Sequence, residues 1–145
     1  MSITLSRAAL FGILIAALIG GCATRTTSDK SLAFVDPMEA SSLLQVRAKL
    51  LGLGGTTSGV WVDPRSTDAY LAGHIPGALH LPLERLRARH EELRGYDVIV
   101  VYGDTYNSAL AIAMSKAVIE LGYRQVHTLR GGLVAWKDAG FDVAK

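Results

Sequence analysis

Short apolar runs alternate with helical segments along most of this chain, and this alternation constrains the fold more than any other feature. The runs that predict strands lie at residues 32–35, 60–62, 97–102 and 125–129, with a further extended stretch at 77–82. Strands that are joined through helices pair in parallel and are covered on both faces. The sequence therefore predicts an α/β fold of three layers, with a central, mainly parallel sheet flanked by helices.

Capping residues predict where several of the helices begin and end. Asp36 is suited to cap a helix and Pro37 to occupy its first position. The apolar side of that helix is expected to consist of Leu43, Leu44, Val46, Leu50 and Leu51. Residues 52–59 are rich in glycine and predict a long flexible loop. Ser66 is expected to cap a second, short helix that Gly73 closes.

Two later segments predict helices with different surroundings. Residues 83–94 combine a narrow leucine stripe with many charges, which predicts a surface helix. Arg87 and Glu91 are four residues apart, so the arginine cluster is interpreted as a self-paired, solvated face rather than a phosphate site. The helix that follows the strand at 97–102 is expected to bury Leu110, Met114, Ala117, Val118 and Leu121 before Gly122 stops it.

The first 21 residues have the composition of a bacterial signal peptide. Arg7 is their only charged residue, and an unbroken apolar run follows it from Ala8 to Ile19. That run is shorter than the roughly 20 apolar residues that a membrane-spanning helix needs. It ends at Ile19-Gly20-Gly21-Cys22, which resembles the lipobox of bacterial lipoproteins. The sequence thus predicts that Cys22 receives diacylglycerol. An uncleaved N-terminal anchor with an incidental cysteine is the alternative.

The segment after the lipobox predicts a membrane tether. Residues 23–31 hold threonine, serine, arginine, lysine and aspartate, and no apolar residue beyond Ala23. Such a composition buries too little surface to fold, so residues 22–31 are expected to link the lipid to a domain at 32–145. Ala23 stands where an acidic residue would favour the inner membrane. The expected location is therefore the cell envelope, facing the periplasm, with the outer membrane favoured over the inner one.

Charge excludes one class of partner. The formal net charge is +2, and Arg7 of the signal peptide supplies one of these charges. The exported part is therefore nearly neutral, which argues against a nucleic-acid-binding surface. Half of the residues are apolar by composition (50%), which suits a single compact domain. No cofactor and no metal site is predicted.

Three separated motifs are similar to those of the rhodanese family. Residues 62–70 read VDPRSTDAY, residues 73–78 read GHIPGA, and residues 129–136 read LRGGLVAW. The first departs from the family pattern because Asp68 lies one place short of the usual second acid. The resemblance implies a rhodanese-like domain, whose active members carry sulfur as a persulfide on a loop cysteine.

Several residues of these motifs are expected to hold the fold together. Asp63 and Arg65 suit a structural ion pair better than substrate chemistry. His74 is expected to hydrogen-bond the surrounding loop, with a role as general base as the alternative. Trp136, together with Leu133, is interpreted as a core residue.

The cysteine that the resemblance implies is missing. After the strand that ends at Tyr102 the chain reads Gly103-Asp104-Thr105-Tyr106-Asn107-Ser108, and its single cysteine is Cys22. Alignment from the strand puts Gly103 in the cysteine's place, and alignment backward from Leu121 shifts the position toward Asp104 or Thr105. None of these alignments supplies the thiolate that a persulfide needs. No catalytic residue is therefore predicted.

Three interpretations of this degenerate loop remain open. It is a plain connection, a retained cradle for a small anion, peptide or lipid headgroup, or an altered active site. In the last case Asp104, Thr105 or Ser108 would be the nucleophile and would need a metal, a base or an arginine as partner. The favoured hypothesis is that Asp104 or Asn107 caps the next helix and fills the vacated site. Tyr106 would then be free to contact a partner.

The predicted function is that of an envelope lipoprotein whose rhodanese-like domain is catalytically inactive and acts as a binding or interaction module. Its expected partners are the membrane, through the N-terminal lipid, and a protein or small anion at the loop. One alternative is a sulfurtransferase or phosphatase-like enzyme that uses a non-cysteine or partner-supplied nucleophile. A purely structural envelope lipoprotein is the other.

Overall fold

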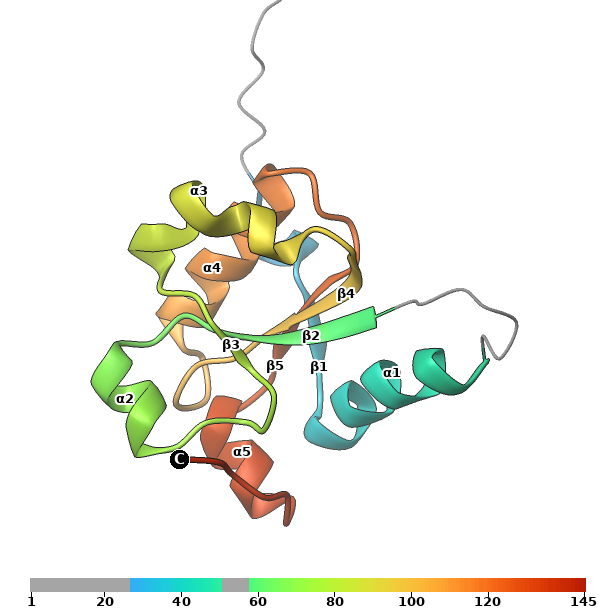
Figure 1. Ribbon diagram of the computed structural model, residues 1–145, viewed down its shortest axis with the longest axis vertical. Coiled ribbons are helices and arrows are strands. Elements are labelled where there is room, and N and C mark those ends of the chain that lie inside the picture. The colour runs from blue at the N-terminus through green and yellow to red at the C-terminus, as the bar shows by residue number, and fades with distance from the viewer. Residues whose placement is uncertain (1–26, 51–57) are drawn as a thin grey trace, which may run out of the picture.

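The computed structural model describes residues 27–50 and 58–145 and gives the alternating strands and helices that the sequence predicts (Figure 1). The strands are β1 (Ala33–Val35), β2 (Ser58–Asp63), β3 (Leu79–His80), β4 (Tyr96–Val101) and β5 (Val126–Leu129). The α-helices are α1 (Pro37–Leu50), α2 (Thr67–Ala72), α3 (Leu86–Arg89), α4 (Ala109–Glu120) and α5 (Gly132–Asp138). Three 3-10 turns are η1 (Asp29–Ser31), η2 (Leu83–Arg85) and η3 (His90–Leu93).

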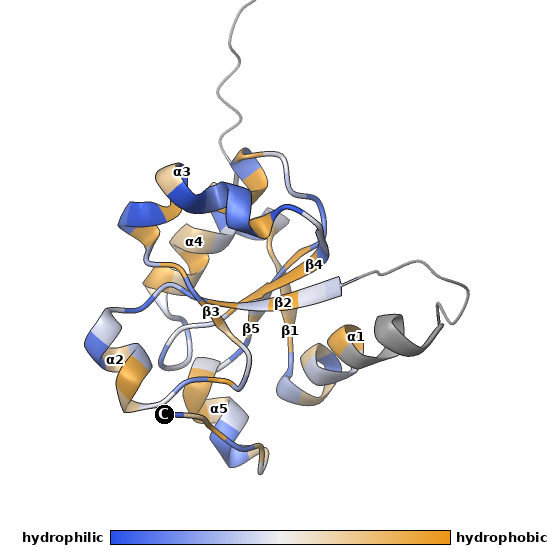
Figure 2. Ribbon diagram, in the orientation of Figure 1, coloured by the Kyte–Doolittle hydropathy of each residue, from blue (hydrophilic) through white to orange (hydrophobic). Residues whose placement is uncertain are grey.

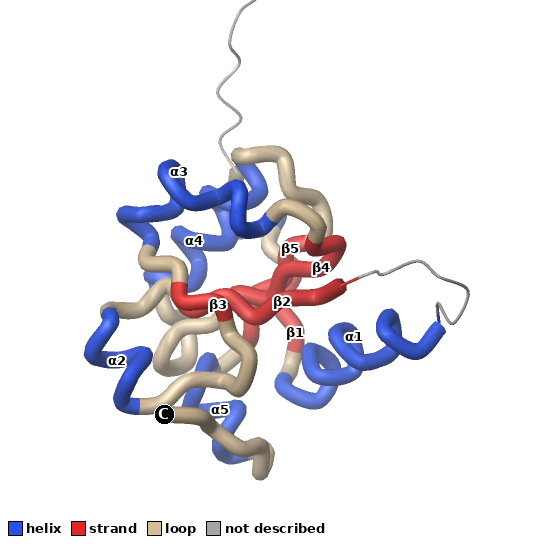
Figure 3. The backbone as a smooth tube through the Cα atoms, viewed as in Figure 1, coloured by secondary structure: helices blue, strands red, loops and turns tan. Residues whose placement is uncertain are grey.

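The five strands, red in Figure 3, form one sheet in the order β1-β5-β4-β2-β3. Every neighbouring pair is parallel. Since all strands point the same way, all their carboxyl ends lie at one edge of the sheet. The predicted α/β fold with a parallel sheet between helices is confirmed.

Side chains on successive strand positions pack on opposite faces of the sheet. Trp61, Val98 and Val100 join a core cluster that also holds Ala40 of α1 and Trp136 of α5. The residues between them belong to the second cluster, which also holds residues of β5, η3, α3, α4 and the segment after β3: Val60, Val62, Ile99, Val101, Val126, Leu93, Leu86, Ala111, Met114, Val118 and Leu81. The strands and α4 are correspondingly apolar in Figure 2, whereas α3 is mostly hydrophilic. Burial on both faces explains why the strands read as continuous apolar runs.

The boundaries of α2 follow the predicted caps. The hydroxyl of Ser66 accepts a hydrogen bond from the amide of Ala69 at 3.3 Å, and Gly73 ends α2. β2 begins at Ser58, inside the stretch predicted as loop. A Cβ on Gly59 would overlap the side chain of Leu44, so this glycine allows α1 to approach the strand closely. Leu121, predicted inward, is 40% exposed because α4 ends at Glu120.

The segment at 83–94 is not the single helix that its pattern predicts. It breaks into η2, α3 and η3. The expected pair of Arg87 and Glu91 is absent from the ion pairs of the described residues, where Glu91 instead pairs with Arg94 at 2.6 Å. Arg89 pairs with Glu92 at 2.6 Å. Both acids thus bind an arginine three residues away, which keeps the cluster self-paired and solvated as expected.

The chain enters the domain beside the end of α4. The amide of Thr27 donates to the carboxylate of Glu120 at 3.1 Å, and Asp29 forms an ion pair with Lys116. Residues 29–31 form the turn η1 where composition predicts a flexible tether.

No helix within residues 27–50 and 58–145 is long and apolar enough to cross a membrane. The predicted signal peptide, Cys22 and most of the predicted tether lie outside the described residues.

Candidate functional site

The loop at residues 103–108 joins β4 to α4 at the carboxyl edge of the sheet. The segments that follow β2 and β5 reach the same edge, since the three strands are adjacent and parallel. Ligand sites of open parallel sheets lie at this edge. Asp63, Arg65 and Gly131 are therefore close to the loop, although they are distant from it in sequence.

Asp63 and Arg65 form a buried ion pair beneath the loop. The guanidinium donates from Nε to Oδ1 at 2.9 Å and from Nη2 to Oδ2 at 2.6 Å, in the two-pronged geometry that arginine and carboxylate favour. Asp63 has no exposed surface (0%) and Arg65 has 4%. The structural role predicted for this pair is confirmed.

Tyr102 completes the network from the end of β4. Its hydroxyl donates to Oδ2 of Asp63 at 2.6 Å and accepts from the amide of Ile75 at 3.1 Å. The guanidinium carbon of Arg65 lies 5.5 Å from the centre of the Tyr102 ring. Burial and the hydrogen bond to Asp63 raise the pKa of the Tyr102 hydroxyl, so Tyr102 serves here as a neutral hydrogen-bond donor.

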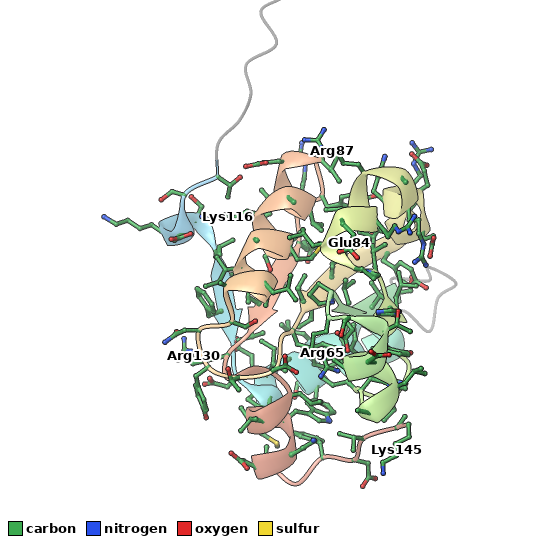
Figure 4. The ribbon with its side chains drawn as sticks, turned by 90° about the vertical axis from the view of Figure 1, so that its left-hand side faces the viewer. Arg65, Glu84, Arg87, Lys116, Arg130 and Lys145 are labelled. Atoms are coloured by element: carbon green, nitrogen blue, oxygen red, sulfur yellow. The ribbon has the colours of Figure 1, made fainter. Side chains whose placement is uncertain are left out.

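Arg65 also reaches the loop itself. Its Nη1 donates to the carboxylate of Asp104 at 2.7 Å, and its Nη2 donates to the carbonyl oxygen of Gly73 at 2.8 Å. Burial opposes the charge on Arg65, but hydrogen bonds to Asp63 and Asp104 outweigh it and raise the pKa of the guanidinium. Figure 4 shows Arg65 in the lower half of the molecule, on the same side of the domain as Arg130. Residues 103–108 contain no arginine of their own. Arg65, from the segment after β2, thus brings an arginine to the loop.

The residue that caps α4 is Ser108, and the prediction that Asp104 or Asn107 does so is wrong. The hydroxyl of Ser108 accepts from the amide of Ala111 at 3.4 Å. Asp104 points to Arg65 instead, because a full positive charge attracts a carboxylate more strongly than a helix end does. Asn107 has a φ of 57°, a left-handed conformation that asparagine tolerates.

Ser108 also occupies the space beside Gly103, which takes the cysteine's place when the family pattern is aligned from the strand. A Cβ built on Gly103 would overlap Oγ of Ser108 and lie 2.5 Å from its Cβ. The space beside Gly103 is therefore filled by Ser108, and not by Asp104 or Asn107 as the sequence predicts. A cysteine does not fit at Gly103 unless Ser108 moves.

The start of α5 holds the loop from the other side. The amides of Leu133 and Val134 donate to the carbonyl oxygens of Gly103 and Asp104 at 2.8 Å and 3.0 Å. Gly132 has a φ of 57°, and a Cβ on it would overlap the carbonyl oxygen of Gly103. This glycine is what allows the helix to approach, which gives the double glycine of residues 131–132 a physical reason.

The outer side of the loop is open. The amides of residues 104–107 donate to no acceptor in the part of the chain that the structure describes. A groove of about 210 Å³ lies between the loop, α4 and the β1–β5 edge of the sheet. Its lining consists of Phe34, Tyr106, Asn107, Ser108, Ala111, Ile112, Thr128, Leu129, Arg130 and Gly131. These amides and the groove are the features of the site that are suited to binding.

Of the partners that an altered enzyme would need, the structure places an arginine at the loop, since Arg65 binds Asp104. Among the residues described, no cluster of histidine, cysteine, aspartate and glutamate could hold a metal ion. Asp104 is bound to Arg65, which lowers its value as a nucleophile. His74 stacks on Tyr70 with ring centres 3.8 Å apart, and its Nδ1 bonds the Tyr70 carbonyl at 3.0 Å. These contacts fit the loop-bracing role predicted for His74.

Known proteins share this sequence pattern. The rhodanese-like domain family matches residues 46–139. The thiosulfate sulfurtransferase GlpE of Coxiella burnetii is 31% identical over 78 residues, which cover 54% of this chain and 71% of that protein. The HTH-type transcriptional regulator Rv0324 of Mycobacterium tuberculosis is 32% identical over 127 residues, or 88% of this chain, and the chain spans only 56% of the regulator's length.

Solved structures share the fold. The BH2092 protein of Bacillus halodurans superposes with a TM-score of 0.61 at 25% identity, covering 79% of this chain and 78% of that chain. A thiosulfate sulfurtransferase of Pseudomonas aeruginosa gives a TM-score of 0.62 at 24% identity, covering 80% of this chain and 21% of that one. The match of the family model to residues 46–139, more than half of the chain, establishes that the chain belongs to the rhodanese-like domain family.

Proposed function

We propose that this protein is an envelope lipoprotein whose rhodanese-like domain has no sulfur-transfer activity and acts as a binding module. The observation that carries the proposal is that a side chain on Gly103, the position aligned with the family cysteine from the strand, would overlap Ser108. Sulfur transfer by a persulfide needs a thiolate at that point. The single cysteine of the chain is Cys22, far outside the domain.

Binding is the role that the remaining features of the loop support. The ion pair to Arg65 offsets part of the charge of Asp104, since Arg65 is shared with Asp63, and Tyr106 lies at the surface. A rigid loop with exposed donors and an aromatic ring is suited to a protein or a small anion. The loop is held by α5 on one side and by Arg65 on the other, so its shape is fixed before a partner arrives.

The envelope location rests on the lipobox at residues 19–22. A thioether at Cys22 would hold the domain at a membrane surface through the segment that ends at Thr27. Ala23 favours the outer membrane in an organism that has one. In this proposal the domain faces the periplasm and carries no free thiol.

The proposed inactivity has a direct assay. The chain, purified from membranes in detergent, is expected to form thiocyanate from thiosulfate and cyanide only at the background rate. Gly103→Cys alone should leave that rate unchanged, because Ser108 blocks the new side chain. The matched variant combines Gly103→Cys with Ser108→Gly. The second change frees the space beside residue 103, and glycine remains an acceptable cap for α4. Turnover by the wild-type chain that Asp104→Ala or Thr105→Ala abolishes would show that the domain is an enzyme.

The proposed lipid anchor is tested separately. In bacteria grown with labelled palmitate, the chain is expected to take up the label and to remain with the membrane fraction. Cys22→Ser should lose the label, because the hydroxyl does not replace the thiol as the alkylated atom. Mass spectrometry of the mature N-terminus checks that cleavage occurs before residue 22. An unlabelled chain that keeps residues 1–21 would instead identify an uncleaved anchor.

A further inference from the structure

We propose that the anchored protein turns the loop of residues 103–108 away from its membrane, so that the binding partner is a soluble protein and not a lipid headgroup. This inference rests on the proposed lipid anchor at Cys22. It follows from where the chain enters the domain and from the direction of α4.

The entry point of the chain is fixed at the C-terminal end of α4. Thr27 donates to Glu120, the last residue of that helix, and Asp29 pairs with Lys116 one turn earlier. In Figures 1 and 4, which share their vertical axis, the described chain begins in the upper half of the molecule, and Figure 4 labels Lys116 in that same half. The end of α4 is therefore the part of the domain nearest to the lipid.

The candidate loop lies at the opposite end of the same helix. Ser108 caps the first turn of α4, and the helix runs for 12 residues to Glu120. At 1.5 Å per residue this separates the loop from the entry point by about 18 Å. In Figure 4 the labelled Arg65 and Arg130, which adjoin the loop, lie in the half of the molecule away from the entering chain.

The short link to the lipid limits how far the domain can turn. Thr27 follows Cys22 by five residues, and even a fully extended link of that length spans at most about 18 Å. The bonds at Thr27 and Asp29 hold the start of the domain against α4, so the link is attached at the end of that helix. The opposite end, with the loop, is the end farther from the point of attachment, and in this proposal it faces the aqueous compartment.

The chemistry around the loop fits a protein. Tyr106 is 59% exposed and Phe34 is 38% exposed, and both line the groove of about 210 Å³. Arg130 is the only charged residue among the described residues of the lining, and its nearest acid, Asp36, is 3.7 Å away. Aromatic rings and arginine are enriched in protein interfaces. The expected partner therefore offers an apolar side chain next to an acidic one.

Fluorescence quenching by lipids tests the orientation. A thioether at Cys22 leaves no free thiol, so a single new cysteine can be labelled with a maleimide dye in the full chain. Thr105→Cys places the dye at the loop, and Gln125→Cys places it on an exposed residue at the entry end. In vesicles that contain nitroxide lipids, the dye at 125 is expected to lose most of its fluorescence and the dye at 105 almost none.

The possible outcomes separate this inference from its premise. A membrane-bound chain in which the dye at 105 is quenched as strongly as the dye at 125 would overturn the orientation, leave the anchor standing and favour a lipid headgroup. A chain that does not float with the vesicles would overturn the anchor and the orientation together. Ala109→Cys and Arg124→Cys repeat the comparison from the same two ends if either first variant fails to fold.

Discussion

Arg65→Met is expected to lower the free energy of unfolding by about 3 to 5 kcal/mol, the usual cost of removing one partner of a buried ion pair. Methionine keeps most of the side-chain volume, so the loss reports the charge and not a cavity. Without the guanidinium, the carboxylate of Asp63 stays buried. Its remaining donors are the Tyr102 hydroxyl and the backbone amide of residue 65. Denaturant unfolding of the chain followed by circular dichroism measures the change.

Two variants serve as controls for this effect. Arg89→Met removes an arginine that pairs with Glu92 at the surface, where ion pairs contribute little, and it should leave the unfolding midpoint close to that of the wild type. Asp104→Ala removes only the exposed member of the network, whose side chain is 64% accessible, and it should cost much less than Arg65→Met. Equal effects for Arg65→Met and Arg89→Met would mean that the buried pair does not stabilise the fold.

Gly132→Ala is expected to be the second strongly destabilising change, with a loss of about 2 to 5 kcal/mol from backbone strain and overpacking combined. The residue has a φ of 57°, and the new methyl group would lie 2.8 Å from the carbonyl carbon of Gly103. To make room, α5 must move away from the loop and weaken the bonds from Leu133 and Val134. Thermal unfolding of the variant measures the loss.

Gly140→Ala isolates the strain from the clash. Gly140 has a φ of 83°, but a Cβ on it meets no atom within 4 Å. Its replacement should cost only the left-handed strain, about 1 to 2 kcal/mol. If Gly132→Ala proves no worse than Gly140→Ala, then close packing of α5 on the loop is not what requires glycine at residue 132.

The fold was accessible from sequence because its signals are local. The apolar runs of β2 and β4 and the cap at Ser66 depend on a few neighbouring residues, and the structure confirms them. The segment at 83–94 failed because its leucine spacing also suits consecutive short turns. Nothing in that spacing distinguishes a continuous helix from the broken path through η2, α3 and η3.

The site was only partly accessible because its contacts are long-range. The pair of Asp63 and Arg65 spans two residues and was predicted, whereas the bond from Arg65 to Asp104 spans 39 residues. Since that bond takes Asp104 away from α4, it also explains why the predicted cap was wrong. The capping role passes to Ser108, whose position depends on the left-handed turn at Asn107.

The contact between Ser108 and Gly103 has a consequence for how this domain can evolve. A mutation that returns cysteine to residue 103 meets the neighbouring serine and gains nothing until a second mutation removes it. If the domain has no sulfur-transfer activity, as proposed, neither change alone would supply it, and selection cannot readily favour one change before the other. On that proposal, descendants of this protein should diversify in what they bind sooner than they gain sulfur transfer.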